Sequence, residues 1–251
     1  DQLWVDKYRP KYLKDIIMKQ DNLNKIHQWM THFKDKKPGY KNSLLLWGPP
    51  GTGKTTIANI ILKQCNYDVI EFNASEKRKQ KIINKQLNDI ISKKNVLDIM
   101  MNNPRNIGVI MDELDGLTTG DRGGMNELIK IMYQFRKNKL KKKVHKEEVT
   151  PFICISNTIN EKKFNDIKKH SVVIKISEPS PYDQTKLIER IMKSENIDID
   201  GYNIKLLIKE SQGDYRRLIN MMQYIYCNND NKKSTDEDTN NDEYTEDLKN
   251  S

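Results

Sequence analysis

The sequence predicts an α/β fold, in which a five-stranded parallel sheet is flanked by helices and followed by a small domain of three helices. Two observations lead to this prediction. Five short apolar runs alternate with helical periodicity over the first 176 residues, and right-handed crossovers arrange such runs as a parallel sheet covered on both faces. Beyond residue 180 the apolar runs cease and three helical patterns follow, which indicates a separate helical unit.

The strands are predicted from runs of aliphatic and β-branched residues, and the helices from periodic apolar positions. The strand segments are Ser43–Trp47, Asp68–Phe72, Ile107–Asp112, Pro151–Ser156 and Val172–Ile176. Helices are expected from near Asn22, from near Lys54, and over Tyr182–Ser194, Tyr202–Ser211 and Asp214–Cys227.

A glycine-rich loop lies between the first strand and the next helix. It reads Gly48-Pro49-Pro50-Gly51-Thr52-Gly53-Lys54-Thr55-Thr56. The loop fits the phosphate-binding pattern Gly-x4-Gly-Lys-Ser/Thr in its required strand–loop–helix context. Its glycines have no Cβ, so the backbone can aim N–H groups at phosphate oxygens near the positive helix end. We therefore expect the loop to bind ATP, with Lys54 reaching the β and γ phosphates.

Two acids lie at the carboxyl end of the predicted third strand. Asp112 would share Mg²⁺ with the hydroxyl of Thr55, because hydroxyl and carboxylate oxygens suit this ion. Glu113 would polarise the water that attacks the γ phosphate, as a hydrolase requires. A merely solvated acid is the alternative for Glu113. The motifs together predict an ATPase.

Composition limits the remaining possibilities. No apolar run approaches eighteen residues, which argues against a membrane span. The chain opens at Asp1 without an initiator Met or a signal peptide, so we expect an excised segment of a longer protein. Cys65, Cys154 and Cys227 have neither metal nor disulfide spacing, which favours an intracellular, reducing compartment.

Charge is unevenly distributed along the chain. The net charge is +9, and the last 24 residues carry eight acids against three lysines, so residues 1–227 carry about +14. A basic folded part favours a polyanionic partner such as DNA, although a compositional bias toward Lys and Asn would produce the same count. Residues 228–251 have almost no apolar side chains and are expected to be a disordered tail or linker.

Taken in order, several short motifs resemble the AAA+ ATPases and, within them, the replication factor C clamp loaders, most closely their large subunits. The resemblance covers residues 3–227. The matching segments are Trp4–Pro10, Gly48–Thr56, Glu71–Ser75, Met111–Gly116, Asp121–Met125, Ser156–Asn157 and Gly213–Arg216. It implies an AAA+ phosphate-loop nucleoside triphosphatase with domains at residues 1–180 (nucleotide binding), 181–227 (helical lid) and 228–251 (acidic tail).

The resemblance also implies residue roles outside the loop. An amino-terminal segment would pack on adenine, and an ordinary extended arm is the alternative. Its contact residues would be Val5, Tyr8, Arg9, Pro10 and Ile17. Asn157 resembles sensor 1, an amide that orients the attacking water, and helix capping is the alternative. Arg216 resembles sensor 2, a guanidinium that the lid brings to the γ phosphate, and an exposed helical Arg is the alternative.

One segment departs from the smaller clamp-loader subunits. They carry Ser-Arg-Cys before the last strand, whereas this chain has Lys169-His170-Ser171. The arginine finger is therefore missing, as in the large subunit. We expect the chain to receive a finger in trans from a smaller subunit, to provide none, and to hydrolyse ATP slowly alone.

Two further surfaces are implied for DNA and for a sliding clamp. DNA contacts would be Lys77, Arg78, Lys81 and Arg122, with solvated surface charge as the alternative. The basic segment Arg136–Lys146 is more typical of a mobile lysine loop. The run containing Val96, Ile99 and Met100 falls where the large subunit docks on the clamp, but it lacks the usual aromatic pair, and core packing is the alternative.

The sequence thus favours a nuclear, ATP-dependent clamp-loader subunit that opens a sliding clamp and loads it on primed DNA. Two alternatives remain. One is the large subunit of a checkpoint or cohesion clamp loader, which segment Asp121–Gly124 disfavours. The other is a nucleotide-gated scaffold with negligible turnover, which Glu113 disfavours.

Overall fold

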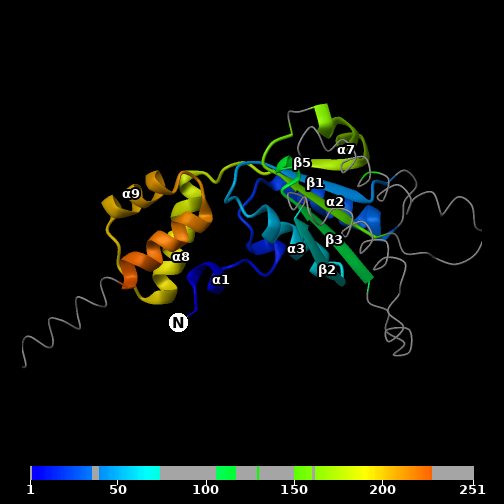
Figure 1. Ribbon diagram of the computed structural model, residues 1–251. Helices are drawn as coiled ribbons and strands as arrows, with labels where there is room; N and C mark the ends of the chain where they lie inside the picture. Colours follow the sequence, from blue (N-terminus) through cyan, green and yellow to red (C-terminus); the bar gives the residue numbers. More distant parts are fainter. Residues whose placement is uncertain are drawn as a thin grey trace, which may run out of the picture. The chain divides into compact units, whose positions relative to one another are not determined.

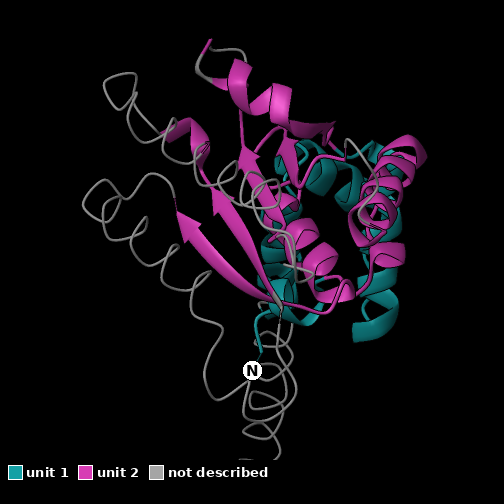
Figure 2. Ribbon diagram, turned by 90° about the vertical axis from the view of Figure 1, so that its right-hand side faces the viewer, with its two compact units in different colours: residues 1–9, 179–251 teal, residues 10–178 magenta. Residues whose placement is uncertain are grey.

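The computed structural model describes residues 2–35, 40–73, 106–116, 129, 150–159 and 162–227. The chain forms two compact units (Figure 2). Unit 1 comprises Asp1–Arg9 and Pro179–Ser251, and unit 2 comprises Pro10–Glu178. No helix in these described ranges combines the length and apolar character needed to cross a bilayer.

Unit 2 contains a five-stranded sheet in the order β2-β3-β4-β1-β5 (Figure 1). All its strand pairs are parallel. The strands are β1 (Ser43–Trp47), β2 (Tyr67–Asn73), β3 (Asn106–Asp112), β4 (Phe152–Ser156) and β5 (Ser171–Lys175). The predicted five-stranded parallel sheet is confirmed, and each predicted strand end lies within one residue of the observed end.

Helices cover both faces of this sheet. On one face, α2 (Gln20–Lys34) and α3 (Lys54–Gln64) contribute to a core with alternate strand residues such as Leu44, Ile110 and Ile153. On the other face, the intervening residues Leu45 and Val109 join a cluster with the short η4 (Lys162–Phe164) and α7 (Asn165–His170). Burial on both faces explains why these strands are continuous apolar runs.

The strand register brings three loops to one edge of the sheet. Ser43 lies beside Phe152 and Ser171, so the amino ends of β1, β4 and β5 are level. At the other end, Trp47 pairs with Ser156 of β4. The ends of β2 and β3 are also level, since Asn73 pairs with Asp112. The segments that follow β1, β3 and β4 consequently emerge together, where parallel sheets bind ligands.

Unit 1 contains α8 (Pro181–Glu195), α9 (Gly201–Ser211) and a helix over residues 215–227. The three helices expected in this part of the chain are present. Ser180 and Asp183 form a capping box at the start of α8, and Asp200 accepts from the first amides of α9. The core of the unit includes the buried side chains of Ile188, Ile191, Leu207, Leu218 and Met222.

The amino-terminal residues also belong to unit 1, although they were predicted to be part of the α/β domain. Trp4, in the short helix α1 (Trp4–Lys7), is buried, and its ring lies 5.3 Å from that of Tyr226. The backbone N–H of Trp4 donates to Gln223, and the side chains of Lys7 and Tyr8 bind Glu195 of α8. These contacts, separated by about 190 to 220 residues in sequence, correct the boundary at this end of the chain.

Candidate nucleotide-binding site

The glycine-rich loop after β1 has a backbone that its glycines permit. Gly51 and Gly53 adopt positive φ angles of 71° and 84°, and α3 begins directly after Gly53. Gly48 is also constrained by space, because a Cβ there would lie 1.9 Å from the carbonyl oxygen of Ile176. The loop therefore curves tightly into the positive end of α3, the geometry of an anion cradle.

Lys54 lies inside this loop. Its side chain is 7% exposed, and its Nζ donates to the carbonyl oxygens of Gly48 at 2.8 Å and Pro49 at 2.7 Å. Thr52 donates from its hydroxyl to the same Pro49 carbonyl at 2.9 Å. Because a buried ammonium needs polar partners, the loop carbonyls hold this charge where a phosphate would bind.

Thr55 and Asp112 meet between α3 and the end of β3. The Thr55 hydroxyl donates to Asp112 Oδ2 at 2.7 Å, while Asp112 Oδ1 accepts from the backbone N–H of Glu113 at 2.7 Å. A hydroxyl and a carboxylate beside a phosphate cradle are the hard oxygen ligands that Mg²⁺ takes. The two residues therefore fit the predicted magnesium site.

Glu113 occupies a strained turn at the sheet edge. Its φ of 55° places a non-glycine residue in the left-handed region. The Asn73 amide, at the end of β2, donates to Glu113 Oε2 at 2.9 Å. Asn73 belongs to a motif singled out in the sequence, but no role was assigned to it, because only the β2–β3 register reveals this contact.

Asn157 follows β4 at the same edge of the sheet. Its side-chain Nδ2 donates to Asp115 Oδ2 at 3.3 Å, and its backbone N–H donates to Asp115 Oδ1 at 3.1 Å. No role was predicted for Asp115 from the sequence. Its position three residues after Asp112 was the signal that could have marked it as a site residue.

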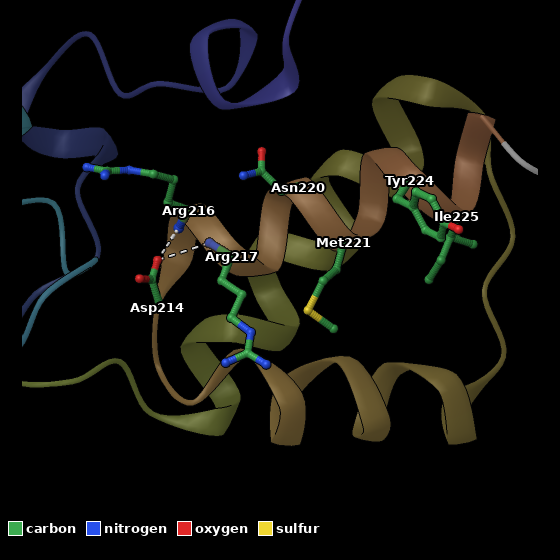
Figure 3. Close-up of a pocket in the computed structure, with 7 residues that line it drawn as sticks. All are labelled: Asp214, Arg216, Arg217, Asn220, Met221, Tyr224 and Ile225. Atoms are coloured by element: carbon green, nitrogen blue, oxygen red, sulfur yellow. Dashed lines mark hydrogen bonds between the residues drawn. The ribbon is translucent and has the colours of Figure 1, made fainter.

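Arg216 lies in unit 1, near the start of the helix over residues 215–227. Its side chain is exposed, and Asp214 Oδ1 accepts from the backbone N–H groups of Arg216 at 2.8 Å and Arg217 at 3.0 Å. Both arginines line a surface pocket of about 520 Å³ with Asn220, Met221 and Tyr224. Figure 3 shows the two guanidinium groups directed away from each other.

The residues predicted to contact adenine are divided between the two units. Val5, Tyr8 and Arg9 belong to unit 1, whereas Pro10 and Ile17 belong to unit 2. Arg9 pairs with Asp6 at 2.9 Å. The other predicted surfaces lie outside the described residues. These are the DNA contacts Lys77, Arg78, Lys81 and Arg122, the clamp contacts Val96, Ile99 and Met100, and the basic segment 136–146.

A parallel sheet with a glycine loop, a buried loop lysine and a strand-end carboxylate defines a phosphate-loop nucleoside triphosphatase. The model of the "ATPase family associated with various cellular activities (AAA)" matches residues 44–176, more than half of the chain. The chain belongs to this family of ATPases, and nucleotide binding follows from that membership. The predicted resemblance to AAA+ ATPases is confirmed.

Individual relatives refine this similarity. The chain is 29% identical to replication factor C subunit 1 of Schizosaccharomyces pombe, over 88% of this chain and 24% of that protein. It is 30% identical to the replication factor C large subunit of Methanococcus maripaludis, over 88% of this chain and 42% of that protein. The chain thus spans about a quarter of the first relative and less than half of the second.

A solved structure with a similar fold is the RuvB Holliday junction branch migration motor of Thermotoga maritima. The two superpose with a TM-score of 0.61 and 17% sequence identity, over 88% of this chain and 65% of that one. At this identity the likeness supports the fold, which agrees with the five-stranded parallel sheet described above.

Proposed function

We propose that the chain is the ATPase core of a clamp-loader subunit of the replication factor C large-subunit type. In this role it binds and hydrolyses ATP to open a sliding clamp and load it on primed DNA. The observation that carries the proposal is the meeting of Lys54, Thr55 and Asp112 at one sheet edge, in a chain similar to replication factor C large subunits.

The proposed chemistry is the attack of water on the γ phosphate of ATP. Glu113 takes a proton from the water as the new O–P bond forms and the bond to the β,γ-bridging oxygen breaks, leaving ADP and phosphate. Lys54 exchanges its loop carbonyls for phosphate oxygens and neutralises their charge. Asn157 orients the water, and Mg²⁺ held by Thr55 and Asp112 would supply further charge stabilisation.

Asn73 adds a restraint on the base. Its amide binds the carboxylate that must accept the proton, so Glu113 has to exchange this hydrogen bond for one with water before it acts. We also propose that Arg216 contacts the γ phosphate, and that the segment from Val5 to Pro10 contacts adenine together with Ile17.

A neighbouring subunit would complete the site. His170 ends α7 just before β5, at the amino edge of the sheet, because Ser171 pairs with Ser43 at the start of β1. The phosphate loop leaves β1 at the opposite edge. A residue at position 170 is therefore remote from this chain's own loop, and the absence of arginine there means that this chain gives no finger. We propose that a smaller clamp-loader subunit supplies one in trans.

The proposed partners are these smaller subunits, a sliding clamp and primer–template DNA, and the proposed location is the nucleus. The basic balance of residues 1–227 favours DNA as a partner. A checkpoint or cohesion clamp loader would use the same chemistry with other partners. A nucleotide-gated scaffold would bind ATP without turning it over.

Single-turnover hydrolysis with and without the smaller subunits, clamp and primed DNA tests the proposal. Glu113→Gln should bind ATP with near-wild-type affinity but hydrolyse it roughly 100-fold more slowly or worse, because the base is lost. Lys54→Ala should bind ATP more weakly than wild type. Glu189→Gln, an exposed site on α8, is the matched control and should behave as wild type. Unchanged hydrolysis by Glu113→Gln would contradict the mechanism, and absence of stimulation by clamp and DNA would contradict clamp loading.

A further inference from the structure

Asp115 accepts hydrogen bonds from Asn157, the residue that follows β4. It lies in the turn η3 (Leu114–Gly116), which directly follows the acids at the end of β3. Its Oδ1 accepts from the Asn157 backbone N–H at 3.1 Å, and its Oδ2 accepts from Asn157 Nδ2 at 3.3 Å. The Ser156 hydroxyl lies 3.1 Å from Oδ1, but its single hydrogen has a shorter contact with the Thr158 carbonyl oxygen, at 2.5 Å. One carboxylate therefore joins the end of β4 to the turn that follows β3.

The chemistry of these partners fixes the orientation of the Asn157 amide. An ionised carboxylate only accepts hydrogen bonds, whereas a primary amide has a donating end and an accepting end. The Nδ2 end must therefore face Asp115, and the Oδ1 end must face away from it. Without the carboxylate, a half-turn of the amide would exchange the two ends at little cost, because the terminal torsion of Asn is broad.

The turn separates the side chains of Glu113 and Asp115. With Glu113 in the left-handed region, its carboxylate binds Asn73 of β2, while Asp115 binds Asn157 after β4. The backbone N–H of Gly116 donates to the Glu113 carbonyl at 2.9 Å and closes the turn. One short turn thus contains the proposed base, Glu113, and also the carboxylate that fixes the orientation of the Asn157 amide.

We propose that Asp115 is a positioning residue that holds the Asn157 carbonyl oxygen as an acceptor for the attacking water. This inference rests on the proposed function of Asn157. A water that donates one hydrogen to Glu113 and the other to Asn157 Oδ1 has both hydrogens engaged, so a lone pair is left for the γ phosphorus. A reversed amide would offer a donor to that lone pair instead and slow the reaction.

The first test is Asp115→Asn in the full chain, a change that keeps shape but adds a donor facing Asn157 Nδ2. Hydrolysis in a single turnover should fall by roughly tenfold or more, as expected when a positioning contact is lost. ATP affinity should stay within about twofold, because the described contacts of Lys54, Thr55 and Asp112 do not include Asp115. Asp166→Asn, which neutralises an exposed acid on α7, is the matched control and should leave both quantities unchanged.

A second readout needs no hydrolysis. The side-chain amide resonances of Asn157, identified by their loss in Asn157→Ala, should shift and exchange faster with solvent in Asp115→Asn without nucleotide. In the Asn157→Ala background, Asp115→Asn should cause no further loss of rate, because the amide that it positions is already gone. The exchange of partners in Asp115→Asn/Asn157→Asp restores a donor facing a carboxylate and should recover part of the rate.

The outcomes separate this proposal from the proposed function. Normal hydrolysis by Asn157→Ala would refute the water-orienting role itself. Slow hydrolysis by Asn157→Ala with normal hydrolysis by Asp115→Asn would overturn the positioning role alone. A third outcome is that Asp115→Asn lowers the hydrolysis rate, the ATP affinity and the melting temperature together, and that the exchanged pair recovers none of them. That result would show that Asp115 only supports the fold, and it would also overturn the proposal.

Discussion

Single residues at the sheet edge are constrained by space as well as by chemistry. Gly48 illustrates this, because its φ of 154° and the Ile176 carbonyl both disfavour a side chain there. Gly201, the first residue of α9, has nothing within 4 Å of the position that a Cβ would occupy. The same substitution should therefore have different consequences at the two sites.

Gly48→Ala should lower the free energy of unfolding by at least about 2 kcal/mol, because a Cβ cannot lie 1.9 Å from a backbone oxygen without moving the loop or the end of β5. Gly201→Ala should leave stability unchanged or slightly raised. Chemical denaturation of both variants measures the difference. Similar denaturation midpoints for Gly48→Ala and Gly201→Ala would show that the loop adapts to a side chain more easily than its geometry indicates.

Tyr215 has a buried polar group that forms no hydrogen bond among the described residues. Burial raises the pKa of this hydroxyl, with a smaller contribution from the charge of Asp183. Tyr215→Phe should leave the free energy of unfolding unchanged or raise it by up to about 1 kcal/mol. Tyr202→Phe, at a side chain that is 77% exposed, is the control, and a large loss in Tyr215→Phe would reveal a partner for the hydroxyl.

Among the elements, α1 and α8 are joined by one carboxylate. Burial alone would raise the pKa of Glu195, but hydrogen bonds from Lys7 and Tyr8 outweigh it and lower the pKa below the ordinary value of 4.5. The hydrogen bond to Glu195 also raises the pKa of Lys7. A lowered carboxyl pKa means that this attachment contributes fully above pH 4.5 and is lost as the pH falls through the folded-state value.

Acidification from pH 7 toward pH 3 should therefore loosen residues 2–9 before the whole unit unfolds. Amide hydrogen exchange of these residues, corrected for the intrinsic pH dependence of exchange, should rise by no more than roughly fivefold, since the Lys7 side chain of this pair is 43% exposed to solvent. Glu195→Gln should show the faster exchange already at pH 7, and Glu189→Gln should not. Equal exchange in the two variants would contradict an attachment through Glu195.

At the scale of the whole molecule, charge is segregated along the chain. Residues 1–227 carry about +14 and the last 24 residues carry −5. Oppositely charged segments of one chain compete with an external polyanion for the same cations, and this competition weakens as salt screens it. The proposed DNA affinity should depend on the acidic segment for this reason.

A chain ending at residue 227 should bind a primer–template duplex roughly threefold or more tightly than the full chain at 50 mM salt, and the difference should shrink by 300 mM. Fluorescence anisotropy over a salt series measures both affinities. A full-length variant with the acids of residues 228–251 changed to their amides separates charge from length and should resemble the shorter chain. Equal affinities at low salt would contradict this prediction.

Local patterns in the sequence determined much of the fold and part of the site. The inner strands of a parallel sheet are short, buried apolar runs, as β1 and β4 are. All five strands were predicted to within one residue. The phosphate loop and the acids after β3 were also visible, because their chemistry requires fixed residue types at fixed spacing.

Only the tertiary structure decided which residues meet across strands. The contacts of Asn73 with Glu113 and of Asp115 with Asn157 span about 40 residues, and they depend on strand order and register. The attachment of residues 2–9 to the helical unit likewise depends on side chains near residues 195 and 223. Periodicity reports which face of an element is buried, but the neighbour across that face is set only when the elements pack together.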